Sequence, residues 1–256
     1  MSLSVYTLLL REVIRFYRQP NRVIGALLQP LIFWLLIGSG LNASFQVGGG
    51  NDVSYLEYFY PGVLLMILLF TSIFSTITII EDRRDGFLQG VLVAPVPRAA
   101  IVIGKSLGGM LLGILQCLVF MLLMLTPMVD LPITPLGFAA AVLCLAVIGF
   151  GLTALGVLMA WPLKSSQEYH ALMSVLLLPL WLFSGAAFPV DGAPVWLHWL
   201  MQVNPLTHAL ALLRHCFYVG VEGGVMGPAP LTVSFGYAAL AGVATFVAAL
   251  LIVRRG

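Results

Sequence analysis

The residues of this chain that could do chemistry lie mainly in one short segment, Glu81 to Arg98, with the sequence EDRRDGFLQGVLVAPVPR. Two acidic residues at its start favour a helix N-terminus, and two prolines near its end would stop the helix. Four apolar residues fall on one helical face, namely Phe87, Leu88, Val91 and Leu92. The segment predicts a short amphipathic helix, with charge on one side for a partner and apolar side chains on the other for packing.

Such a helix has two interpretations, and the residues alone favour neither. It could transmit force from another subunit to the segments on either side of it. It could also be an interfacial helix that only fixes the topology of the chain. The surrounding elements decide what it could act on.

The composition is that of a membrane protein. The chain has 256 residues, of which 61% are hydrophobic and 9% are charged, and its mean hydropathy is +1.05. Soluble domains have about 25% charged residues. The basic residues are spread over loops and tails and form no aromatic-interleaved patch, so the net charge of +2 implies no nucleic-acid partner and none is expected.

Six apolar segments approach or exceed the roughly 20 residues that cross a bilayer. They are longer than the strands of a membrane barrel, so all six are predicted to be helices. We therefore expect an all-α, polytopic membrane protein forming a single transmembrane domain over residues 1–256. The predicted spans are 23–41, 59–80, 106–128, 136–160, 171–188 and 232–253.

The basic residues fix the predicted orientation. Eleven of the twelve Lys and Arg residues fall on one side of the six-span pattern, and only Arg214 falls on the other. By the positive-inside rule, both termini are cytoplasmic in a multi-pass protein of the cytoplasmic (inner) membrane of a prokaryote. No ionisable residue is expected within the core of any span.

Residues 1–22 differ in pattern from the spans. Arg11, Arg15 and Arg18 recur at helical spacing among apolar residues, and Arg22 follows. We expect a basic amphipathic helix on the cytoplasmic face, with these four arginines at the membrane interface. The alternative is a solvated tail whose arginines only set the topology.

The segment 204–220 is too short for a seventh span and carries Arg214. Asn204 can cap a helix that begins at Pro205. Its apolar residues then form one stripe, Leu206, Leu210, Leu213 and Phe217. Residues 189–231 are therefore predicted to form a partly buried cap of re-entrant helices over the outer end.

Other motifs do not support an enzyme or a metal site. The four histidines form no HExxH pair and have no acidic residue at ligand spacing, so no metal is expected. Gly104-Lys105-Ser106 satisfies a relaxed phosphate-loop pattern, but an apolar run leads it directly into a span. The three cysteines are interpreted as small apolar packing residues.

In the 81–98 segment, Arg84-Asp85-Gly86-Phe87-Leu88-Gln89 followed by Leu92-Val93-Ala94-Pro95 resembles the cytoplasmic coupling region of type-two ATP-binding-cassette exporter permeases. Gln89 stands where that family commonly has Glu. The resemblance extends to Gly104-Lys105, to Phe188-Pro189-Val190, and to Asn204-Pro205-Leu206-Thr207 followed by Arg214. It covers the whole chain, including the six-span layout.

The resemblance implies the membrane-spanning permease subunit of an exporter, not an enzyme. ATP and Mg would bind to a separate ATPase subunit, and this chain would need no cofactor. The implied ATPase contacts are Glu81, Asp82, Arg83, Arg84, Asp85, Gly86, Phe87, Leu88 and Gln89. The other expected partners are a second copy of the chain or a related permease, and the lipid bilayer.

The cargo expected from an uncharged path is amphipathic or lipid-linked. Two other classes of protein compete with this exporter. An ion-coupled secondary transporter generally uses ionisable residues at mid-membrane, and the predicted spans have none. An intramembrane enzyme needs a polar constellation at depth, where the spans offer only isolated Ser, Thr, Gln and Cys.

Overall fold

A computed structural model describes residues 2–42, 54–126, 129, 131–189, 194–218 and 230–255, with the side chains of 2, 21, 22 and 42 left out. The chain is helical throughout its regular structure there, which confirms the all-α prediction. The helices are α1 (Ser2–Tyr17), α2 (Pro20–Asn42), α3 (Tyr55–Ser75), α4 (Thr78–Arg84), α5 (Phe87–Val93), α6 (Arg98–Met121), the 3-10 turn η1 (Leu122–Leu125), α7 (Pro135–Ala160), α8 (Ser166–Leu182), α9 (Val195–Val203), α10 (Pro205–Phe217) and α11 (Leu231–Arg255).

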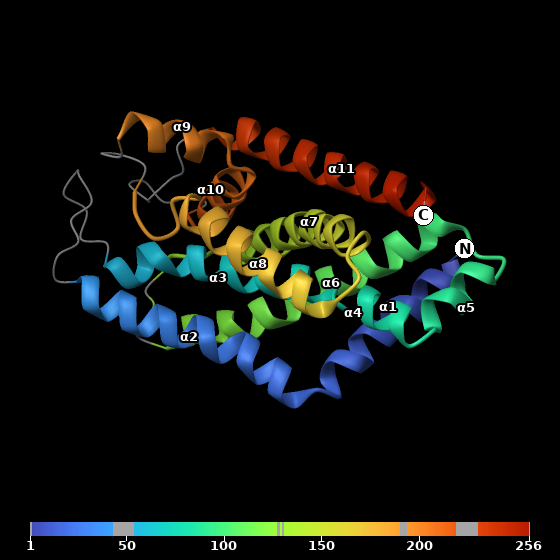
Figure 1. Cartoon of the computed structure of the whole chain (residues 1–256). Coiled ribbons are helices and arrows are strands. Elements are labelled where there is room, and N and C mark those ends of the chain that lie inside the picture. Colours follow the sequence, from blue (N-terminus) through green and yellow to red (C-terminus); the bar gives the residue numbers. More distant parts are fainter. Residues whose placement is uncertain are drawn as a thin grey trace.

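Five helical segments of the described chain are long and apolar enough to cross a membrane. They are Val23–Leu41, Tyr55–Arg84, Arg98–Leu125, Pro135–Ala160 and Leu231–Arg255. Five of the six predicted spans are thereby confirmed as long apolar helices of a polytopic membrane protein. Both termini lie at the same end of the bundle, beside α5 (Figure 1).

The predicted span 171–188 has different bounds in the structure. Its helix, α8, begins at Ser166 and ends at Leu182. A turn follows in which Gly185 has a φ of 79°, a left-handed conformation that favours glycine. An apolar sequence therefore continues past the end of the helix, and α8 has 17 residues.

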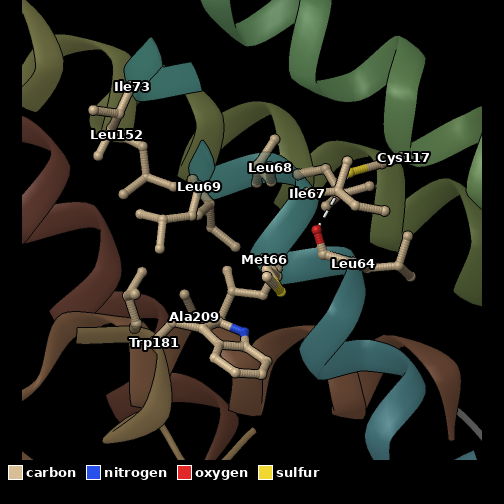
Figure 2. Packing of buried hydrophobic residues seen from close by; sticks show 14 of the residues in the cluster. Leu64, Met66, Ile67, Leu68, Leu69, Ile73, Cys117, Leu152, Trp181 and Ala209 are labelled. Carbon is tan, nitrogen blue, oxygen red and sulfur yellow. Dashed lines mark hydrogen bonds between the residues drawn. The ribbon is translucent and has the colours of Figure 1, made fainter. Parts of the chain in front are cut away.

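The core is built around α3, which contacts α2, α6, α7, α8 and α10. Most of this helix is buried, because its side chains are apolar on every face. Figure 2 shows Leu64, Met66 and Leu69 of α3 among residues from the surrounding helices. Its N-terminus is fixed by Ser54 and Glu57, which form a capping box.

Candidate functional site

Charged side chains converge where α1, α4 and α6 meet. The helix α3 pauses at Thr76–Ile77 and resumes as α4, which ends at Arg84. Gly86 follows with a φ of 80° and lets the chain turn into α5. The predicted single helix over 81–98 is therefore wrong in its start: Glu81 and Asp82 belong to α4, and the new helix begins at Phe87.

Asp82 is the centre of this convergence and is 1% exposed. Arg11 donates to both of its carboxylate oxygens, at 2.9 and 2.6 Å. Arg15 donates to Oδ1 at 2.8 Å and, with its other nitrogen, to Glu81 at 2.6 Å. The hydrogen bonds to Asp82 raise the pKa of Arg11. These contacts join α1 to α4 by charge-assisted hydrogen bonds.

Lys105 completes the arrangement from α6 and is 3% exposed. Its ammonium donates to Glu12 Oε1 at 2.6 Å, to Thr78 Oγ1 at 2.8 Å and to Asp82 Oδ2 at 2.9 Å. An ammonium has three donors, so all of them are used. Thr78 donates in turn to Glu12 Oε2 at 3.0 Å. Lys105 thus faces carboxylates, which is not the setting of a phosphate-binding lysine.

We call Arg11, Glu12, Arg15, Glu81, Asp82 and Lys105 the ion-pair cluster. It contains three cations and three carboxylates, so its formal charges balance. Balance is what allows Glu12, Asp82 and Lys105 to be buried, since an unpaired buried charge is very costly.

Two glycines of α6 let α1 approach closely enough to form this cluster. A Cβ built at Gly104 would lie 2.9 Å from Leu8, and one at Gly108 would lie 3.0 Å from the Cβ of Glu12. Small residues four apart permit such close helix packing. The close approach of α1 to α6 at these two glycines therefore places Glu12 beside Lys105.

Two of the four N-terminal arginines have surroundings other than the predicted membrane interface. Arg11 and Arg15, which were assigned to the membrane interface, point to Asp82 and Glu81 because α1 packs on α4 and α6. Arg18 is exposed, and the Arg22 side chain lies outside the described residues. An exposed apolar stripe on α1 still fits a membrane surface, formed by Leu3, Tyr6, Leu10, Ile14 and Tyr17.

The nine residues predicted to contact an ATPase fall into inward and outward groups. Leu88 is 3% exposed, Asp82 is buried in the cluster, and Glu81 is paired with Arg15. Arg83 donates to the carbonyls of Trp161 and Leu163 at 2.7 and 3.1 Å. The outward group, which a partner could reach, consists of Arg84, Asp85, Gly86, Phe87 and Gln89.

Phe87 links the outward group to the cluster. The guanidinium carbon of Arg11 lies 3.8 Å from the centre of its ring. This distance is within the range of a cation–π contact. A displacement of α5 would therefore reach α1 directly.

A cavity of about 440 Å³ lies beside the cluster, between α2, α3 and α8. Phe70, Phe74 and His170 supply aromatic surface, with the Phe74 and His170 rings 5.5 Å apart. Glu81 of the cluster and Gln29 of α2 also line it. The cavity is thus mainly apolar with a few polar groups, as ligand sites are.

At the opposite end, α9 and α10 pack over the bundle (Figure 1). Asn204 accepts from Leu206 N at 3.0 Å and donates to Leu180 O at 2.6 Å, so it caps α10 as predicted and also fastens it to α8. Arg214, 4% exposed, donates to Gly185 O at 3.1 Å and lies 4.4 Å above the Tyr58 ring.

The sequence predicted that α10 is buried along one apolar stripe, but the helix is more deeply buried than that. The helix is buried on nearly every side, Pro205 and His215 being the partly exposed exceptions, because α3, α7 and α11 surround it. Residues 190–193 and 219–229 of the predicted cap lie outside the described residues.

Comparison with known proteins gives the family. Residues 4–218 match the family described as ABC-2 type transporter. The chain is 30% identical over 217 residues to the putative transport permease ycf38 of Cyanophora paradoxa, covering 84% of this chain and 74% of that protein. It is 27% identical to the daunorubicin resistance ABC transporter permease protein DrrB1 of Streptomyces coeruleorubidus, over 84% and 75%. Nodulation protein J of Rhizobium leguminosarum bv. viciae is 26% identical, over 78% and 80%.

These matches confirm the resemblance first read from the residues around Gly86 and Asn204. In this family the permease spans the membrane and ATP is hydrolysed by a partner subunit, so the chain is a transport subunit that needs no cofactor of its own. In the described residues, no three His, Cys, Asp or Glu side chains gather to hold a metal. The chain belongs to the ABC-2 type transporter family, as the membrane permease subunit of an ATP-binding-cassette exporter.

Proposed function

We propose that this permease moves an amphipathic or lipid-linked substrate out of the cytoplasm or inner leaflet, driven by an ATPase that docks on the exposed tip of α5. The observation that carries the proposal is the ion-pair cluster. It connects the tip, through Arg11 and Asp82, to Glu81 at the edge of the 440 Å³ cavity.

The outward residues are the proposed docking surface. The side chains of Arg84 and Asp85 are 78% and 55% exposed, and Gln89 is exposed beside them. They offer both signs of charge and an amide to a partner, while Leu88 anchors the helix. A push on α5 would then move α1 and α4 together, because buried paired charges resist separation.

The cavity supports the substrate class. Its walls are apolar and aromatic, and polar groups such as Gln29 and His170 could orient the polar part of a cargo. Relatives are named for daunorubicin resistance and for nodulation. A drug-like molecule and a lipid-linked glycan both belong to the proposed class.

We also propose the six-span topology, with α8 as the remaining crossing. At 1.5 Å per residue its 17 residues extend about 25 Å, and the apolar turn that follows would complete the passage through about 30 Å of hydrocarbon. Both termini are then cytoplasmic, in the inner membrane of a prokaryote.

A second subunit would complete the transport path. The chain contains no internal repeat of the six-span unit. Apolar side chains are exposed on two of the helices that border the cavity, including Leu36 of α2 at 68% and Val175 of α8 at 76%. We propose that these faces meet a second copy, in a homodimer, with a related permease as the alternative.

The test of docking is co-purification of the tagged chain, solubilised from membranes, with its candidate ATPase. The variant Gly86→Asp with Phe87→Asp should lose the ATPase and ATP-dependent transport while the permease stays in the membrane. Lys164→Glu is the control, because Lys164 is exposed and belongs to the turn between α7 and α8, outside the predicted contact residues. Normal transport by the double variant would refute docking at the tip, and a wild type that forms no complex would reject this ATPase as the partner.

The topology is tested by labelling single cysteines in a background without the three native ones. Val195→Cys should react with an impermeant maleimide from outside, since Val195 is 76% exposed on α9. Lys164→Cys should react only after the membrane is opened. If both label from the same side, α8 does not cross.

A further inference from the structure

Two cysteines from different helices meet where the last turn of α10 packs on α7. The sulfur of Cys144 on α7 lies 3.6 Å from that of Cys216 on α10, although the residues are 72 positions apart. Both thiols are free. A disulfide bond is about 2.05 Å long, so the two sulfurs would have to approach by about 1.5 Å.

Backbone packing holds these thiols together. A Cβ built at Gly137, in the first turn of α7, would lie 2.4 Å from the carbonyl oxygen of Cys216. The last turn of α10 therefore rests directly on the start of α7. Ala141, one turn further along α7, is fully buried.

Cys117 provides an internal contrast. Its thiol is fully buried and donates to the carbonyl oxygen of Leu64 at 3.4 Å (Figure 2). Its partner is thus an oxygen, whereas Cys144 and Cys216 face each other. Cys144 is also half-buried, which leaves it more accessible than Cys216 at 5% exposure.

We propose that Cys144 and Cys216 are a disulfide modification site that fastens α10 to α7. The Cys144 thiolate attacks one sulfur of an external disulfide and releases one thiolate. Cys216 then displaces the second thiolate from the mixed disulfide. The pair loses two protons and two electrons, and the external disulfide is reduced to two thiols. This site is independent of cargo and of ATPase docking.

The test uses the full chain in native membranes and 2,2′-dithiodipyridine, an apolar disulfide that can reach a thiol near lipid. After denaturation, free thiols are alkylated and the peptides are analysed by mass spectrometry. The wild type and Cys117→Ser should both show a 144–216 linked peptide, and Cys144→Ser and Cys216→Ser should not. Absence of the linked peptide from wild type, whether its thiols stay free or carry pyridyl adducts, would overturn the proposal.

The fastening role has a separate readout. A cross-link between positions 144 and 216 restrains a long loop in the unfolded chain, and we expect the thermal midpoint of the purified complex to rise by about 10 °C on oxidation. Dithiothreitol should reverse the shift, and Cys216→Ser should show none. A linked protein with an unchanged midpoint would contradict fastening.

Discussion

At the end of the bundle where the termini lie, Arg11 and Arg15 are held by carboxylates, whereas at the opposite end Arg214 is held by a tyrosine ring and a carbonyl oxygen. The first arrangement is a balanced network contributed by three helices. In the second, the contacts on Arg214 come from neutral groups. Removing a carboxylate from the first therefore leaves several charges unpaired, while removing Arg214 leaves neutral contact groups behind among the described residues.

The largest effect in this comparison is expected from Asp82→Ala. It leaves Arg11, Arg15 and Lys105 short of a partner, and breaking a buried ion pair costs about 3–5 kcal/mol. The thermal midpoint of the detergent-solubilised protein should fall sharply. Asp85→Ala is the control, because the Asp85 side chain is 55% exposed. Equal midpoints for the two variants would show that the cluster does not stabilise this end.

The next largest loss of stability is expected from Arg214→Met, which replaces the guanidinium but retains an unbranched side chain of roughly similar length. The variant loses the contact with the Tyr58 ring and the hydrogen bond to Gly185, together about 2 kcal/mol. Its midpoint should lie between those of Asp82→Ala and the wild type. Arg84→Met, at a 78% exposed side chain, should be neutral. If Arg214→Met lowers the thermal midpoint as much as Asp82→Ala does, the two ends of the bundle are not stabilised in different ways.

Local patterns predicted much of the fold. The long apolar runs indicated the confirmed helices, and Asn204-Pro205 indicated the start of α10. The charges of α4 were misleading, because hydropathy marks them as the end of a span whereas the helix continues to Arg84. It can do so because Asp82 is neutralised by residues about 70 positions earlier, a pairing that no local pattern contains.

Other features depended on tertiary packing. No local pattern pairs Glu12 with Lys105, although the spacing of Gly104 and Gly108 indicates that another helix lies against α6. The burial of α10 on nearly every side cannot be predicted from its periodicity, which shows one apolar stripe. Its remaining side chains, such as Ala209 and Thr207, are small enough to pack on the other faces as well.

A smaller effect is expected from Gly108→Ala, which tests the approach of α1 to α6. The added methyl group would lie 3.0 Å from the Cβ of Glu12, and overpacking of this kind costs about 1–2 kcal/mol. The midpoint should fall, and limited proteolysis should release α1 faster. Gly90→Ala on α5 is the matched control, since nothing lies within 4 Å of its added Cβ. If Gly108→Ala is as stable as Gly90→Ala, α1 can shift away from α6 without a loss of stability.

The smallest effect is expected from Phe87→Leu, which removes the ring beneath Arg11 but keeps an apolar side chain. A partly exposed cation–π contact contributes about 0.5–1 kcal/mol, so the midpoint should hardly change. Transport per ATP hydrolysed should nevertheless fall if this contact connects the α5 tip to the ion-pair cluster. Phe87→Trp restores a ring and should restore the ratio. If transport per ATP hydrolysed is unchanged in Phe87→Leu, the α5 tip is connected to the bundle through the covalent turn at Gly86 instead. The ion-pair cluster would then only stabilise its end of the bundle, as Arg214 does at the opposite end.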